Sequence, residues 1–208
     1  MNTRFKKETQ NQNMDFMLSK PISKVVSKMA VPTVISMLVV SVYSLADMFF
    51  VSKLGTDASA AVGIVFSILT MIQAVGFMLG IGAGSLISRS LGAGNTEEKD
   101  SIASVAFFSS IIGGFFVLIF GILFKTEVMQ FLGATSTILP YAKDFSHYIL
   151  IASPIMCASF VLNILLRTQG KPHLSMIGLA VGGVLNIILD PIFIFGLKMG
   201  IGGAAVAT

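Results

Sequence analysis

The stretch NIILDPIFIFG, Asn186 to Gly196, places a single aspartate, Asp190, inside a run of apolar residues. Between His173 and Lys198 lie 24 residues, and Asp190 is the only formally charged one among them. A helix that crosses a bilayer needs about 20 predominantly apolar residues, each rising about 1.5 Å. Segment 174–197 is therefore long and apolar enough to span a membrane, and its aspartate requires an explanation.

The composition of the whole chain indicates a membrane protein. Hydrophobic residues make up 54% of the 208 residues and charged residues only 12%, and the mean hydropathy is +0.87. Soluble domains of this size rarely have such a composition. One cysteine excludes a disulfide framework and a thiolate metal cluster. We therefore predict an all-α fold, a polytopic bundle of membrane helices.

Charged residues divide the chain into apolar windows, which we interpret as five complete spanning helices and the start of a sixth. Residues 1–28 precede them as a polar, basic tail. We expect a chain that stops inside its sixth helix to be incomplete, because half a spanning helix leaves carbonyls unsatisfied in hydrocarbon. The predicted transmembrane region, 29–208, comprises helices over 29–52, 58–88, 101–124, 145–166, 174–197 and 199–208.

The distribution of basic residues predicts the orientation. With the tail in the cytoplasm, ten of the fourteen Lys and Arg residues fall in cytoplasmic segments. This favours a multi-pass protein of the cell membrane with a cytoplasmic N-terminus. The net charge of +4 then reflects topology, and no nucleic-acid partner is implied.

Two carboxylates share one depth in the predicted bundle. Asp47 lies six residues before Lys53 and Asp190 eight before Lys198, which corresponds to about 9 and 12 Å of helix. They are the only two of ten carboxylates inside a spanning window. A charge at such a depth is costly and usually marks an ion or substrate route, although a structural role between helices remains an alternative.

Polar neighbours accompany both acids. Asn186 precedes Asp190 by one turn on the same helix face, and Asn163 adds an amide in the fourth window. A partly polar stripe on the first helix is formed by Ser36, Val40, Tyr43 and Asp47. Two carboxylates close together would bind and release a proton, or hold a cation, as one coupled unit.

Other features have structural interpretations. Small residues four apart in GFMLGIGAG, 76–84, predict close helix packing, because this run lies inside an apolar span rather than after a strand. His147 lies near the end of its window and is interpreted as an interfacial side chain. Pro32, Pro154 and Pro191 are candidate kinks.

Three segments together resemble a known family. They are SLADMFFVSKLGTDASAAVGI (44–64), GAGSLISRSLGAGN (82–95) and residues 166–208 with their LNIILDPIFIFG block. The chain from about residue 20 is similar to the multidrug and toxic compound extrusion (MATE) transporters, in their bacterial DinF/MepA-like branch. The resemblance implies the N-terminal lobe of a twelve-helix transporter, which exchanges drugs for protons or sodium ions by alternating access.

The resemblance also implies roles for individual residues. Asp47 and Asp190 match the family's cation site, which would bind a proton or sodium, and Asn163, Asn186 and Thr208 complete its network. Pro32 matches a proline whose bending accompanies protonation. Val40 stands where some members carry a glutamine, so the hydrogen-bond network differs there. Some members also lack the first acid, so Asp47 points towards DinF-like ion chemistry.

The implied partners are drug-like small molecules, cationic or amphipathic, together with the bilayer and a missing C-terminal lobe. No cofactor beyond the coupling ion is expected. The 17 Phe and 12 Met residues would suit an adaptable apolar lining and equally a packed core.

Three alternatives remain at the level of sequence. A lipid-linked precursor or metabolite exporter of the same superfamily would line its cavity with basic residues, and none lies in a spanning window. An intramembrane aspartyl protease needs Tyr-Asp and Gly-x-Gly-Asp signatures, which the chain lacks, so no enzyme is predicted. A non-transporting membrane fragment is the third.

Overall fold

The computed structural model describes residues 21–93 and 98–208, and these residues form helices without any strand. Five of the helices are long and apolar enough to cross a membrane, which confirms the predicted class. The elements are α2 (Ile22–Ser52), α3 (Thr56–Gly92), α4 (Glu98–Leu123), α5 (Lys125–Phe131), α6 (Leu139–Thr168), α7 (Pro172–Pro191), the π-helix η1 (Ile192–Gly196) and α8 (Ile201–Ala207).

The helices extend beyond the apolar windows. Helix α2 begins at Ile22 rather than at residue 29, and α6 begins at Leu139 rather than at 145. Charged residues mark where a helix leaves the hydrocarbon. Lys, Arg and Glu have helix propensities similar to that of Leu, so the helical backbone can continue beyond the apolar window. Residues 1–20 of the predicted tail and residues 94–97 of the second predicted loop lie outside the described residues.

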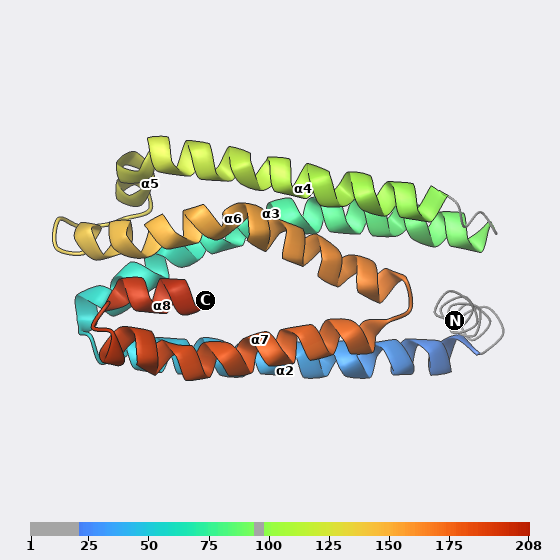
Figure 1. Ribbon diagram of the computed structural model, residues 1–208, viewed down its shortest axis with the longest axis horizontal. Coiled ribbons are helices and arrows are strands. Elements are labelled where there is room, and N and C mark those ends of the chain that lie inside the picture. Colours follow the sequence, from blue (N-terminus) through green and yellow to red (C-terminus); the bar gives the residue numbers. More distant parts are fainter. Residues whose placement is uncertain (1–20, 94–97) are drawn as a thin grey trace.

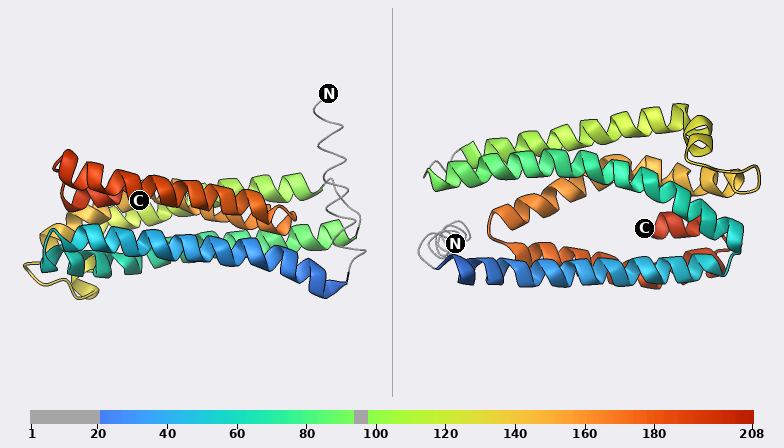
Figure 2. Two further views of the ribbon diagram at one scale, coloured as in Figure 1. Left: turned by 90° about the horizontal axis from the view of Figure 1, so that it is seen from below. Right: turned by 180° about the vertical axis from the view of Figure 1, so that it is seen from behind.

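The helices form two groups that lie side by side (Figure 1). Helix α2 packs against α7 in one group, and α3, α4 and α6 pack together in the other. Figure 1 and the right-hand view of Figure 2 show the short helix α8 between the two groups. Helix α8 packs against α6 and η1, so it connects the two groups near one end of the bundle.

Glycines bring α3 close to α6, as the small-residue spacing predicts. A Cβ added at Gly76 would lie 2.7 Å from Phe160 Cβ, and one added at Gly84 would lie 2.7 Å from Thr168 Cγ2. Gly80 between them faces Ile164 in the same way. Without side chains on this stripe of α3, the two helices pack at close range, which is how membrane helices associate.

The contact between α4 and α6 centres on Pro154. A Cβ added at Gly114 would meet the backbone of Pro154, so α4 lies directly against α6 there. Pro154 has no N–H to donate to the carbonyl of Leu150. Ser153 Oγ lies 2.7 Å from Leu150 O and 3.0 Å from Gly114 O, and its hydroxyl can donate to either. Helix α6 changes direction along its length in Figure 1, as expected of a helix with a proline in its middle.

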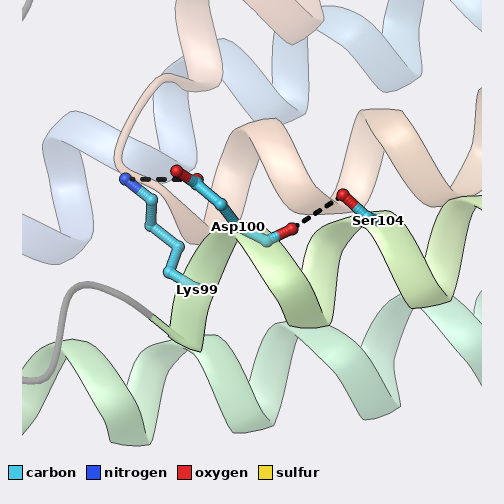
Figure 3. A network of polar contacts seen from close by, with 3 residues as sticks. All are labelled: Lys99, Asp100 and Ser104. Atoms are coloured by element: carbon cyan, nitrogen blue, oxygen red, sulfur yellow. Dashed lines mark hydrogen bonds and ion pairs between the residues drawn. The ribbon is translucent and has the colours of Figure 1, made fainter.

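Polar contacts also occur at the end of the bundle where α4 begins. Lys99 Nζ lies 3.8 Å from Asp100 Oδ1, and Ser104 Oγ donates to Asp100 O at 2.8 Å (Figure 3). Large apolar side chains such as Phe108, Phe116 and Phe120 are exposed further along α4. An apolar outer surface with polar ends is the pattern of a helix bundle in a bilayer.

Candidate functional site

Asp190 lies on the buried face of α7, together with Gly183 and Asn186. The side chain of Asp190 is fully buried, at 0% exposure, and it is the only fully buried carboxylate in the described part of the chain. The next residue is Pro191, after which the backbone widens into the π-helix η1. Single π-turns inside helices occur often at functional sites.

Asn186 links Asp190 to the end of the chain. Its Nδ2 donates to Asp190 Oδ1 at 3.4 Å and also lies 3.5 Å from Thr208 Oγ1. Thr208 in turn donates to the carbonyl of Ala204 at 3.1 Å. Both amide contacts are long for hydrogen bonds, so they hold the three side chains together only weakly. The structure thus brings together three of the residues that sequence analysis selected.

Asp47 reaches the same region from α2. Gly183 of α7 faces Val39 and Tyr43 of α2, so the two helices are in register at that level. Seven residues further on α7 is Asp190, and four residues beyond Tyr43 is Asp47, so both acids lie within about 10 Å of helix beyond this contact. The side chain of Asp47 is half-buried.

Three oxygen atoms of this cluster are buried and accept no hydrogen bond from any described residue. They are Asp47 Oδ1, Asn186 Oδ1 and Asp190 Oδ2. Buried polar atoms are nearly always paired, and an unpaired buried carboxylate oxygen is costly. Carboxylate, amide and hydroxyl oxygens are the donors that hard cations take. The arrangement therefore suits a proton or a small hard cation.

The cluster does not have the composition of a transition-metal centre. Within residues 21–93 and 98–208, no group of three His, Cys, Asp or Glu side chains is placed to hold a metal ion. We call the side chains of Asp47, Asn186, Asp190 and Thr208 the acid cluster.

Asn163 and Pro32 form no hydrogen bond to the acid cluster within the described part of the chain. Asn163 is half-buried on α6, and among the described residues it forms no hydrogen bond to the cluster. Pro32 is buried within α2, which continues through it, and Ser36 Oγ donates to the Pro32 carbonyl at 2.8 Å. His147 is exposed on α6 beside Tyr148, far along the chain from either acid.

Gly183 was missed at the level of sequence. It lies three residues before Asn186 and seven before Asp190, so helical periodicity puts it on their face. A glycine at such a position signals a close helix approach. The glycines of α7 could not be distinguished from one another without knowing which helix covers that face.

A bundle of membrane-length helices with a buried carboxylate and a buried amide between them is typical of a membrane transport protein. Comparisons with known proteins agree. The sequence profile of the MatE family matches residues 32–192, so the chain belongs to the MATE family of transporters.

Relatives within this family carry different names. The chain is 31% identical over 196 residues to an FAD transporter of Shewanella oneidensis, covering 92% of this chain and 43% of that protein. It is 31% identical over 188 residues to the multidrug export protein MepA of Staphylococcus haemolyticus, covering 90% of this chain and 42% of that protein. The chain therefore spans less than half of the length of these relatives.

A solved structure shares the fold. An outward-facing multidrug resistance MATE family transporter of the MOP superfamily superposes with a TM-score of 0.89 at 33% identity. The match covers 94% of this chain and 43% of that chain. Most of this chain thus has a counterpart in one part of a MATE transporter.

Proposed function

We propose that this chain forms the cation-coupling N-terminal lobe of a MATE antiporter, which exports drug-like compounds in exchange for protons or sodium ions. The observation that carries the proposal is the buried Asp190, whose Oδ1 accepts a hydrogen bond from Asn186 while its Oδ2 has no hydrogen-bond partner among the described residues. Family membership supports transport and argues against the protease alternative.

The acid cluster can couple two movements through charge. Two carboxylates in one apolar environment repel each other, and a proton or sodium ion between them removes this repulsion. Losing that ion restores negative charge, which attracts a cationic substrate. A cation and a cationic substrate then exclude each other, which is the differential binding that exchange requires.

A second lobe is part of the proposal. Transporters built from repeats move one repeat against the other around a site between them. The described helices provide one wall, with α2 and α7 carrying the acid cluster, and the relatives are more than twice as long as the matched region. We propose a cell-membrane location with a cytoplasmic N-terminus, in line with the distribution of basic residues.

The substrate proposed here is cationic or amphipathic, in the manner of multidrug exporters. The name of the Shewanella relative supports a second candidate, an anionic dinucleotide such as FAD. Recognition of its phosphates would call for Arg or Lys in the substrate path. The buried site described above is acidic instead, so its electrostatics favour cationic compounds over FAD.

Export assays with Asp190→Asn test the proposal. The amide keeps the size of the side chain but cannot cycle its charge, so cation-driven ethidium export by the complete transporter should fall to background. Asp57→Asn, at an exposed position at the start of α3, is the matched control and should export normally. The proposal would be refuted if Asp190→Asn exported ethidium at the wild-type rate while the mutant and wild-type proteins were present in the membrane in equal amounts. Release of FAD from the same vesicles, in place of ethidium, would select the second substrate class.

A further inference from the structure

Gly183 lies at the contact between α7 and α2, seven residues before Asp190 of the acid cluster. A Cβ added there would lie 3.0 Å from Tyr43 Cδ1 and 3.1 Å from Val39 Cγ1. Ordinary contacts between carbon atoms are about 3.5 to 4.0 Å, so a methyl group would push the two side chains back by about 0.5 Å. Glycine at this position therefore sets how closely α2 approaches α7.

The neighbouring glycines of α7 carry no such requirement. A Cβ added at Gly178 or Gly182 would meet nothing within 4 Å. Glycine is the least favourable residue after proline in a helix interior, so glycine at each of these three positions makes helix α7 less stable than alanine would. Only at Gly183 does the missing side chain correspond to a helix contact.

The contact acts on the side of α2 that carries Asp47. Tyr43 precedes Asp47 by one turn, which puts the two residues on the same face of α2. On α7, Gly183 shares the buried face with Asp190. Val39 is β-branched and stiff at χ1, and Tyr43 is bulky, so relieving the contact requires α2 to move as a whole, which carries Asp47 away from Asp190.

We infer that Gly183 is a positioning residue that sets the separation of Asp47 and Asp190, through Tyr43 and Val39, and thereby the affinity of the transporter for its coupling cation. The inference rests on the proposed function. A binding site has to be held within about 0.5 Å of its working geometry, which is the displacement that one methyl group would cause here.

The test compares Gly183→Ala with Gly182→Ala in proteoliposomes of the complete transporter that contains this chain. Drug export is measured against the concentration of the driving cation, proton or sodium. A misplacement of about 1 Å costs on the order of 100-fold, so about 0.5 Å should raise the half-saturating cation concentration about tenfold in Gly183→Ala. Gly182→Ala gains the same helix propensity and should behave like the wild type. Equal cation dependence in the two variants would overturn the inference.

A rescue variant separates positioning from general damage. Val39→Ala removes one of the two atoms that the new methyl group meets and leaves Tyr43 Cδ1, so adding it to Gly183→Ala should restore part of the cation affinity. A variant that merely destabilised the helix would not recover in this way. Failure of the rescue, with export still impaired, would assign the loss to another cause and refute positioning through this contact.

A distance measurement keeps the inference testable without transport. Spin labels at the exposed positions Leu45 and Ile188 report the separation of α2 and α7. The inter-label distance should increase in Gly183→Val and stay the same in Gly182→Val. If the inter-label distance does not increase in Gly183→Val, the inference is overturned, whatever the export activity. If the distance increases but the wild-type transporter shows no cation-driven export, only the proposed function is overturned.

Discussion

Replacing Gly114 with alanine should destabilise the bundle, because α4 lies against the backbone of α6 at this residue. The new methyl group would meet Pro154 Cα, Pro154 N and the Ser153 carbonyl, which lies 2.8 Å from the added Cβ. These are backbone atoms, so no change of rotamer can make room. The two helices must separate at the crossing.

The magnitude follows from three contributions. Overpacking a close contact costs about 1 to 3 kcal/mol, and the rigid backbone places this site in the upper part of that range. Separation of the helices also weakens the bond from Ser153 Oγ to Gly114 O, which is worth about 0.6 kcal/mol in a membrane bundle. Replacing glycine in a helix returns up to about 1 kcal/mol. We expect a net loss of about 2 kcal/mol.

Unfolding of the purified chain in mixed micelles with increasing SDS, followed by far-UV circular dichroism, measures this loss. Gly82→Ala on α3 is the control, because a Cβ there would meet nothing within 4 Å. The control should be as stable as the wild type or slightly more stable. The packing argument is refuted if Gly114→Ala unfolds at the same SDS fraction as Gly82→Ala.

Two further predictions concern topology and the acid cluster. A cysteine replacing Glu98 should react with a polar maleimide only after permeabilisation, whereas one replacing Thr135 should react from outside; labelling of position 98 in intact cells would reverse the proposed orientation. Asn186→Ala should weaken cation-driven export far more than Asn163→Ala, because Asn186 forms hydrogen bonds to Asp190 and Thr208, whereas Asn163 forms no hydrogen bond to either of them within the described residues. Equal losses would show that Asn163 joins the cluster in another conformation.

Much of the fold could be predicted from where charges interrupt the apolar sequence. Five spanning helices follow from five windows, because a bilayer demands a minimum apolar length whatever the rest of the protein does. The close approach of α3 to α6 follows from glycines four residues apart, since these lie on one helix face. The common depth of Asp47 and Asp190 follows from helical rise alone, and α2 and α7 do lie in register.

Other features depend on which helices become neighbours, and sequence spacing does not contain that information. Helix α5 was not predicted, because its seven residues are too short to show periodicity. The transition at Pro191 from α7 to a π-helix depends on the packing of α8 against η1: a Cβ added at Gly203 would lie 2.7 Å from Phe193 C. Asn163 lies on α6, and its spacing in the sequence does not say whether it reaches Asp190, whereas the structure joins Asn186 to Asp190 and Thr208 by hydrogen bonds.

The most direct test of cation coupling uses the drug gradient itself as the driving force. Proteoliposomes of the complete transporter are loaded with a cationic dye and diluted into dye-free buffer with equal cation concentrations on both sides, and internal pH and sodium are recorded. Outward movement of dye should drive protons or sodium ions inward although these ions have no concentration gradient at the start. Asp190→Asn should abolish this uptake. Dye efflux through the wild-type protein without any cation uptake would contradict the account.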